Sequence, residues 1–159
     1  MTVVSDTTPL HYLILIGEVD LLRDVFGTVV LPEAVRRELS HPHAPEAVRR
    51  WAGSLPAWVE VQAAPSGAVS GDLLRLDAGE REAILLANAL RADLVLIDER
   101  IGRAIARQKG LRVTGTLGVL LRASEQGGVD LAQAVERLRQ TNARFSPILL
   151  RDVLGKARS

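Results

Sequence analysis

The chain has 159 residues, enough for one domain with its own core and too few for two ordinary ones. Hydrophobic residues make up 47% of it and charged residues 25%, which excludes an intrinsically disordered protein. The formal net charge of +1 gives no strong overall attraction to nucleic acid, and the lack of cysteine excludes disulfides and thiolate metal sites. We therefore expect a single domain over residues 1–159.

The first half of the chain is expected to alternate short buried strands with short helices. Val3-Val4 opens a strand that stops at Asp6, and Pro32 is suited to the first position of a helix. The other expected elements are helices over about 10–16 and 19–25, a strand over 27–31, helices over 33–39 and 45–51, and a short edge strand over 58–61. The small residues 63–68 are expected to form a loop inside one domain.

The second half contains the clearest amphipathic helix, over residues 76–90. Residues 94–97 are apolar throughout, as in a strand covered on both faces. The remaining expected elements are a helix over 101–108 that stops at Gly110, a strand over 111–113, and helices over 117–126, over 131–141 and from Pro147. Strands that alternate with helices in this way predict an open α/β fold with a parallel sheet and right-handed crossovers.

Two aspartates directly follow predicted buried strands. Asp6 comes after the first strand, and Asp98 comes after residues 94–97, with Glu99 beside it. Ligands of such sheets bind at the carboxyl ends of the strands, where the strand order reverses, so both carboxylates are candidate site residues. The alternative is that each aspartate caps the helix that follows it.

Two glutamates fall on the apolar stripes of predicted helices. Glu38 lies three residues after Val35 and so shares its inward face, where an unpaired carboxylate is costly. An ion pair with an arginine is the alternative explanation for Glu38. Glu80 lies four residues before Ile84 on the stripe of the helix over 76–90. Its alternative role is to complete a capping box in which Asp77 is the N-cap.

The four acids Asp6, Glu38, Glu80 and Asp98 offer only oxygen ligands, the type that magnesium and manganese prefer. Carboxylates held close together raise each other's pKa values unless a cation neutralises them. If the fold brings these four together, the sequence predicts a divalent metal site. No G-x-G-x-x-G turn follows the first strand and no P-loop motif occurs, which excludes dinucleotide-binding and P-loop folds.

The N-terminal segment has no basic region and carries an acid at Asp6, where a signal peptide would be apolar. The longest apolar runs, such as residues 13–16, are far too short to span a bilayer. We therefore expect a cytoplasmic protein with no membrane association.

Four segments, in this order along the chain, resemble the PIN-domain family: VVSDTTPL, LPEAVRREL, LDAGEREAILLA and LVLIDERIGRAIA. Within that family the chain looks most similar to a VapC-like subgroup, whose C-terminal half carries a motif resembling RVTGTLGVLLRASEQG. The similarity covers nearly the whole chain. It implies a three-layer α/β/α domain with a central parallel sheet, one or two bound Mg²⁺ or Mn²⁺ ions, and cleavage of RNA.

The resemblance also implies which residues are catalytic and bind the metal: Asp6 as the first acid, Glu38 as the second, Glu80 as the third and Asp98 as the fourth. The third acid of the family is often aspartate, so Glu80 departs from the pattern. Glu99 takes the role of Asp98 if the turn is shifted by one residue. Thr7 or Thr8 matches the small hydroxyl residue that supports the site.

The implied reaction is metal-assisted hydrolysis of a phosphodiester, with Asp6 and Asp98 as direct ligands. Glu38 and Glu80 would complete the shell or act through waters. Arg100 and Arg103 are expected either to hold a backbone phosphate or to belong to a solvated helix face.

The partners implied by the resemblance are an RNA substrate and, for the toxin of a toxin–antitoxin pair, an antitoxin protein. The apolar faces of the C-terminal helices are suited to a homodimer interface or to the core. The competing hypothesis is a non-catalytic PIN-like module that binds RNA or a protein partner, for which metal should not stabilise the fold. No function is expected for His11 or for the pair His41 and His43.

Overall fold

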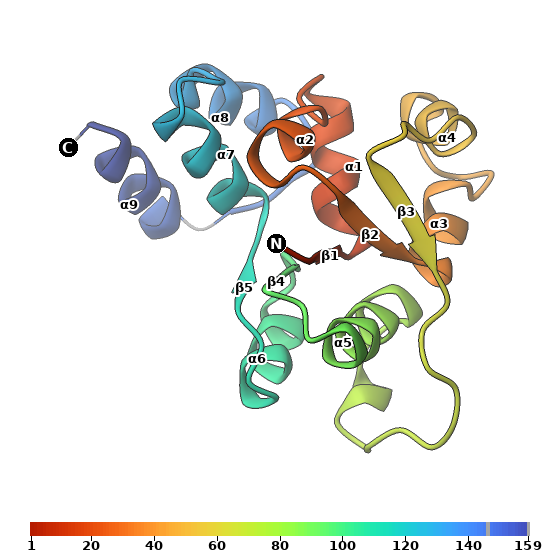
Figure 1. Ribbon diagram of the computed structural model, residues 1–159. Coiled ribbons are helices and arrows are strands. Elements are labelled where there is room, and N and C mark those ends of the chain that lie inside the picture. The colour runs from red at the N-terminus through yellow and green to blue at the C-terminus, as the bar shows by residue number, and fades with distance from the viewer. Residues whose placement is uncertain (146, 159) are drawn as a thin grey trace.

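The computed structural model describes residues 1–145 and 147–158. At its centre is a five-stranded sheet in which all neighbouring strands are parallel. The strands are β1 (Val3–Ser5), β2 (Val29–Pro32), β3 (Val59–Gln62), β4 (Leu94–Leu96) and β5 (Val113–Thr114). They lie in the order β3-β2-β1-β4-β5 (Figure 1), so β1 is central and the chain order reverses between β1 and β4.

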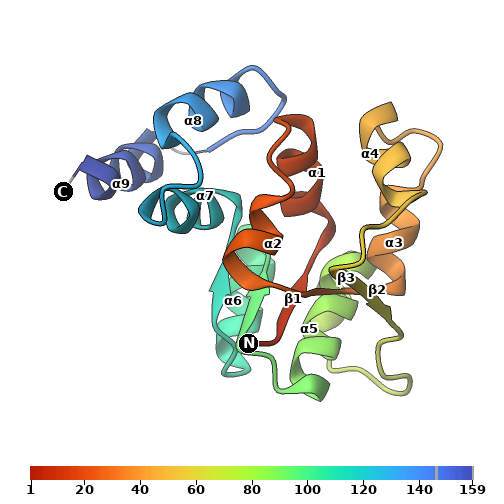
Figure 2. The same cartoon turned by 45° about the horizontal axis from the view of Figure 1, so that its top comes forward.

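Helices cover both faces of the sheet and make three layers (Figures 1 and 2). In chain order they are α1 (Thr7–Leu15), α2 (Leu21–Phe26), α3 (Glu33–Leu39), α4 (Glu46–Ala52), the short 3₁₀ helix η1 (Leu73–Arg75), α5 (Ala78–Leu90), α6 (Arg100–Gln108), α7 (Thr116–Glu125), α8 (Leu131–Arg139) and α9 (Pro147–Arg158). Helices α5 and α6 lie on one face, and α1, α2 and α7 lie on the other. The predicted three-layer α/β/α fold with a parallel sheet is confirmed.

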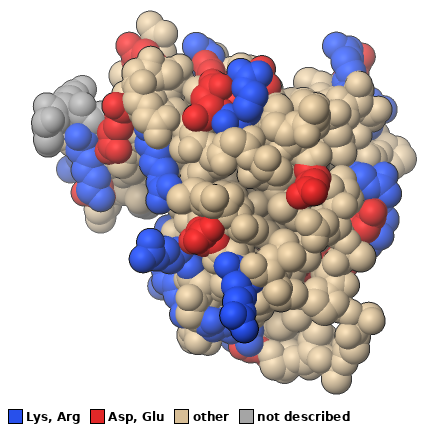
Figure 3. Space-filling model, viewed as in Figure 1, with Lys and Arg blue, Asp and Glu red and all other residues tan. Residues whose placement is uncertain are grey.

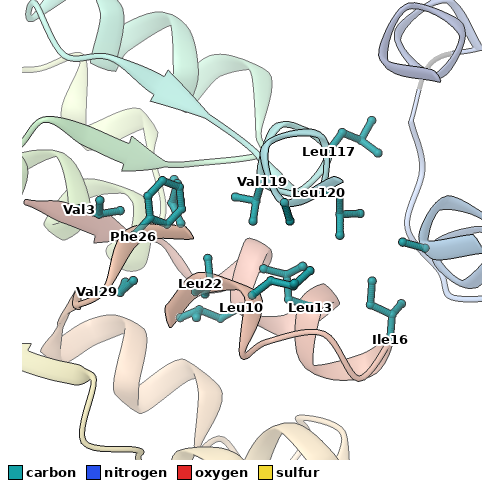
Figure 4. Packing of buried hydrophobic residues seen from close by; sticks show 14 of the residues in the cluster. Val3, Leu10, Leu13, Ile16, Leu22, Phe26, Val29, Leu117, Val119 and Leu120 are labelled. Atoms are coloured by element: carbon teal, nitrogen blue, oxygen red, sulfur yellow. The ribbon is translucent and has the colours of Figure 1, made fainter. Parts of the chain in front are cut away.

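Each face of the sheet has its own hydrophobic core, because successive strand residues point to opposite faces. In β1, Val3 belongs to the core that contains Leu10 of α1 and Leu120 of α7 (Figure 4). Its neighbour Val4 belongs to the second core, with Ile84 of α5. All five side chains are fully buried. A strand covered on both faces is therefore apolar at consecutive positions, as Val3 and Val4 are.

The start of α1 differs from the sequence prediction. The helix begins at Thr7 rather than near residue 10, so Pro9 lies inside its first turn. Proline is tolerated there because the first amides of a helix have no acceptor within the helix. As a result, α1 begins directly after Asp6 instead of being separated from it by an extended segment.

The start of α5 also differs, by two residues, because Leu73–Arg75 forms η1 and Asp77 caps α5 at Ala78. Other expectations are confirmed: β3 is an edge strand, and Gly110 ends α6 with a φ of 82°, a conformation that favours glycine. In the described ranges, no helix is both long enough and apolar enough to cross a membrane.

Candidate metal centre

Asp6 and Asp98 lie on the two sides of the point where the strand order reverses. Asp6 directly follows β1, and Asp98 comes two residues after β4. These strands are neighbours, and the amide of Asp6 donates a hydrogen bond to the carbonyl of Leu96 at 2.9 Å. Both carboxylates therefore emerge at the edge of the sheet where open α/β folds bind their ligands.

Asp6 is a buried acid without a full set of partners. Its side chain is 3% exposed, and its Oδ1 has no hydrogen-bond partner among the described residues. Burial raises the pKa of Asp6 to about 8, although a hydrogen bond from the amide of Thr7 lowers it; the charges of Asp77, Glu38 and Asp98 raise it further. A carboxylate in such a place is ionised at neutral pH only when a cation accompanies it.

Glu38 reaches the same point from α3. Its carboxylate accepts hydrogen bonds from the hydroxyl of Thr7 and from the backbone amide of Gly79, the latter at 3.0 Å. A Cβ atom on Gly79 would lie 2.8 Å from Oε2 of Glu38 and 2.9 Å from Oδ1 of Asp6. Residue 79 therefore has to be glycine for both carboxylates to keep these positions.

Asp77 completes a cluster of three carboxylates. One oxygen from each of Asp6, Glu38 and Asp77 lies within 4.8 Å of the others. Asp77 also caps α5, because its Oδ1 accepts a hydrogen bond from the amide of Glu80 at 2.8 Å. From the sequence, Asp77 was expected only as a cap, since its spacing from Glu80 fits a capping box. A carboxylate has two oxygens, however, and can cap a helix with one and face a metal with the other.

Glu80 lies beside this cluster rather than within it. Its side chain is 7% exposed, its Oε2 has no hydrogen-bond partner among the described residues, and a Cβ on Gly102 would lie 2.8 Å from that oxygen. Burial raises the pKa of Glu80, and contact with the carboxyl group of Asp77 raises it further. Glu80 therefore belongs to the same group of interacting acids, between α5 and α6.

Asp98 is held in place from α7. The amide of Thr116 donates to its Oδ1 at 2.7 Å, and the Thr116 hydroxyl donates to its Oδ2 at 2.6 Å. Burial raises the pKa of Asp98, while these hydrogen bonds and the charge of Arg103 oppose the shift. The acid that caps α6 is Glu99, which accepts a hydrogen bond from the amide of Gly102 at 3.0 Å. Asp98 therefore bonds to α7 and does not cap the helix that follows it.

No ion pair in the described part of the chain neutralises these acids, although the charge of Arg103 acts on Asp98. None of the ion pairs closer than 4.0 Å includes Asp6, Glu38, Asp77, Glu80 or Asp98. The ion pair considered for Glu38 is therefore not formed. Three observations show that these residues fit a divalent cation. All the donor atoms are oxygens, Oδ1 of Asp6 has no partner among the described residues, and Gly79 has no side chain that would push the carboxylates apart.

A parallel α/β sheet with converging carboxylates at its switch point defines a protein with a candidate acidic metal site. A family model, DUF3368, described as a PIN domain, matches residues 2–159. The chain belongs to the PIN-domain family. No curated protein and no solved structure matches it significantly. PIN domains are generally metal-dependent nucleases, so the family and the acidic cluster together indicate a nuclease-type function.

Proposed function

We propose that the chain is an endoribonuclease that hydrolyses RNA phosphodiesters with Mg²⁺ or Mn²⁺. The observation that carries the proposal is the convergence of Asp6, Glu38 and Asp77, three carboxylates without a cationic partner among the described residues. Membership in the PIN-domain family supports the same chemistry. The choice of RNA over DNA rests on the resemblance of the sequence to VapC-like ribonucleases.

Asp6, Glu38 and Asp77 are proposed as metal ligands. The sequence predicted Asp6 as a direct ligand and Glu38 as a ligand that completes the shell or acts through water, and Asp77 is added to them. Asp98 and Glu80 stay in the proposed catalytic set as further ligands or as acceptors for metal-bound water. Burial raises the pKa of both carboxyl groups. This supports a role in the site, because acids with shifted pKa values are concentrated in active sites.

A bound Mg²⁺ or Mn²⁺ ion lowers the pKa of a coordinated water and stabilises negative charge on a phosphate oxygen. The protein contributes fixed geometry. Thr7 and Gly79 orient the Glu38 carboxylate, and Thr116 holds both oxygens of Asp98. Ligands that are hydrogen-bonded in advance do not have to be reordered when the substrate arrives.

The resemblance to the VapC-like subgroup supports a biological role as the toxin of a toxin–antitoxin pair, acting in the cytoplasm and inhibited by an antitoxin protein. Helix α9 offers a surface for a partner, because Ile148 is 76% exposed. A homodimer is the other proposed use of the C-terminal helices. Light scattering after size-exclusion chromatography measures the mass in solution, and a monomer would contradict the homodimer.

The proposed activity is tested by incubating end-labelled single-stranded RNA with the purified full chain in Mg²⁺, Mn²⁺ or EDTA. We expect cleavage with the metals and none in EDTA. Asp6→Asn and Asp98→Asn should slow cleavage by more than the roughly 10- to 100-fold that loss of a supporting residue typically costs. Equal cleavage by the wild type and Asp6→Asn would mean that the activity does not come from this site.

Two control variants make the test specific. Asp20→Asn removes an exposed carboxylate that makes no cap to α2, so its activity should equal that of the wild type. Glu99→Gln keeps an oxygen that can cap α6, and its activity should also be retained. Loss of activity in Glu99→Gln but not in Asp98→Asn would transfer the proposed role to Glu99.

The same proteins separate the nuclease from the non-catalytic PIN-like module. Metal that binds only the folded chain must raise its melting temperature. A chain that shows neither cleavage of varied RNAs nor a metal-induced rise in Tm would be a binding module instead.

A further inference from the structure

A cleft of about 580 Å³ opens beside Asp98, next to the metal centre. Its lining comes from α1, from the turn after β4, from α6, and from Arg144, Phe145 and Leu149 near the start of α9. This volume lies within the range of about 300–1,000 Å³ that is typical of pockets for small organic ligands. The cleft therefore has room for one or a few unpaired nucleotides and not for a nucleic-acid duplex.

Four arginines line the cleft, and three of them share one face of α6. Arg100, Arg103 and Arg107 are spaced by three and four residues, which places them along the same side of the helix. On the face drawn in Figure 3, positive side chains gather around the position of α6. The pKa of Arg103 is lowered by its burial and by the charge of Arg107, so gathering these cations has a cost.

Among the described residues, Arg100, Arg103, Arg107 and Arg144 form no ion pair closer than 4.0 Å. Arg103 interacts at longer range with the carboxylate of Asp98, which partly offsets the lowering of its pKa by burial. Cations left unpaired around a cleft are free to bind an anionic ligand. The guanidinium group is well matched to phosphate because its fork of N–H donors meets two oxygens at once.

Aromatic side chains are rare in this chain, which has two Trp, two Phe and one Tyr. Three of them serve packing: Phe26 is buried in the core, and the rings of Trp51 and Trp58 lie 6.2 Å apart. The other two, Tyr12 and Phe145, also pack partly against the core, but both line the cleft and are only partly buried. Accessible aromatic rings beside arginines are the combination with which proteins bind unpaired bases.

We propose that this cleft binds an unpaired nucleotide of the substrate strand beside the cleaved bond, with its base stacked on Phe145 and the flanking phosphates on Arg103, Arg107 and Arg144. The proposal rests on the proposed nuclease function, because Asp98, which that function places in the catalytic set, also lines the cleft. It adds a requirement: the strand must be single-stranded next to the scissile phosphate, since a paired base cannot reach Phe145.

Binding is measured without catalysis, by fluorescence anisotropy of a labelled RNA of about ten nucleotides with the full chain in EDTA. We expect Phe145→Leu to weaken binding about tenfold, the loss expected for one stacked base. Arg107→Gln should weaken binding and lower the slope of log K against log salt by about one. Arg112→Gln is the matched control, because Arg112 is exposed and lies just before β5, at the opposite end of the strands from the cleft. The affinity of this variant for RNA should equal that of the wild type.

Other probes identify the ligand. Single-stranded DNA of the same sequence should bind through the same residues, and a blunt RNA duplex should bind more weakly than the single strand. Equal affinity for the duplex, or wild-type affinity in both Phe145→Leu and Arg107→Gln, would overturn the proposal. Polyglutamate that binds as tightly as RNA and depends on Arg107 but not on Phe145 would also overturn it, in favour of an acidic protein segment. A melting temperature equal to that of the wild type shows that a variant is folded. If Phe145→Leu proves unstable, Arg107→Gln still tests the proposal, because Arg107 is exposed and its substitution should not affect folding.

The two proposals fail in different ways. Absence of cleavage in Mg²⁺ and Mn²⁺, combined with RNA binding that depends on Phe145 and Arg107, removes the nuclease and keeps the binding cleft. Cleavage combined with binding that ignores both substitutions removes the cleft and keeps the nuclease.

Discussion

The backbone amide of Gly79, in the first turn of α5, donates a hydrogen bond to Oε1 of Glu38 on α3 at 3.0 Å. These residues are 41 positions apart in the sequence, and their contact joins two helices at the metal centre. Because glycine has no side chain, the carboxylates of Glu38 and Asp6 can lie directly against its backbone.

Gly79→Ala is expected to disrupt metal binding while leaving the fold intact. The new Cβ would lie within 2.9 Å of oxygens of Glu38 and Asp6, so both carboxylates have to move. We expect the affinity for Mn²⁺, measured by calorimetry, to fall by about 10- to 100-fold. Gly155→Ala is the control in α9, where a Cβ meets nothing within 4 Å, and it should leave the Mn²⁺ affinity unchanged. Wild-type affinity in Gly79→Ala would contradict this account of the site.

Substitutions at Asp77 can separate its cap from its proposed ligand role. Asparagine is as good an N-cap as aspartate, so Asp77→Asn should keep the stability of the metal-free protein within a few tenths of a kcal/mol. It removes the negative charge, however, and should weaken Mn²⁺ binding. Asp77→Ala should lose the metal affinity and also about 1 kcal/mol of unfolding free energy. If Asp77→Asn binds Mn²⁺ like the wild type, Asp77 is only a cap.

Thr116 is expected to act by positioning Asp98. Thr116→Val removes the hydroxyl that donates to Oδ2 of Asp98 and keeps the shape of the fully buried side chain. We expect a loss of about 1.5–3 kcal/mol of stability at neutral pH, the usual contribution of a hydrogen bond to a charged group. The pKa of Asp98 should rise further, which shifts the acid limb of the pH–rate profile upward. Thr116→Ser restores the donor and should restore the profile; a profile that is unchanged in the valine variant would exclude this role.

The buried acids predict how stability depends on pH in the metal-free protein. The pKa of Asp6 rises from 3.8 to about 8 on folding because of burial, so between these values the folded state binds more protons than the unfolded state. The free energy of unfolding must therefore fall as the pH rises through this window. We expect Tm in EDTA to decrease from pH 5 to pH 8, and Asp6→Asn to reduce the decrease.

The same linkage applies to metal binding. A divalent cation binds the ionised carboxylates, so its binding should release protons and its affinity should rise over the same pH window. Calorimetry in buffers of different ionisation enthalpy measures the released protons. No proton release at pH 7 would contradict the raised pKa of Asp6.

The fold was predictable because the inner strands β2 and β4 are covered on both faces and are therefore apolar at consecutive positions, as residues 94–97 are. The limits of the helices were less predictable. A proline that follows a strand can help to end an extended segment, but it also fits the first turn of a helix, which is where Pro9 lies. The sequence contains nothing that distinguishes these two uses, because the choice depends on how α1 packs against its neighbours.

The positions of the four acids were predictable, while their role as a site stays a prediction. The stripe positions of Glu38 and Glu80 indicated inward-facing acids, and the strand ends placed Asp6 and Asp98 at the edge of the sheet, where the structure has them. The packing of α3 against α5 decides which carboxylate oxygens lie close together. This packing brings together residues as far apart in the sequence as Glu38 and Gly79, 41 positions, and cannot be deduced from local spacing. For that reason Asp77 was explained fully by its cap, and the supporting contacts of Gly79 and Thr116 were not anticipated.

The unneutralised acids at the edge of the sheet also affect how long a molecule of this protein survives. In the proposed metal-bound form, the folded state gains stability with every increase in free metal, because the unfolded chain has no assembled site. Proteases that digest transiently opened chains act in proportion to the population of the open form. Turnover of this protein should therefore accelerate when divalent metal is scarce, so that its abundance follows the metal supply as well as its rate of synthesis.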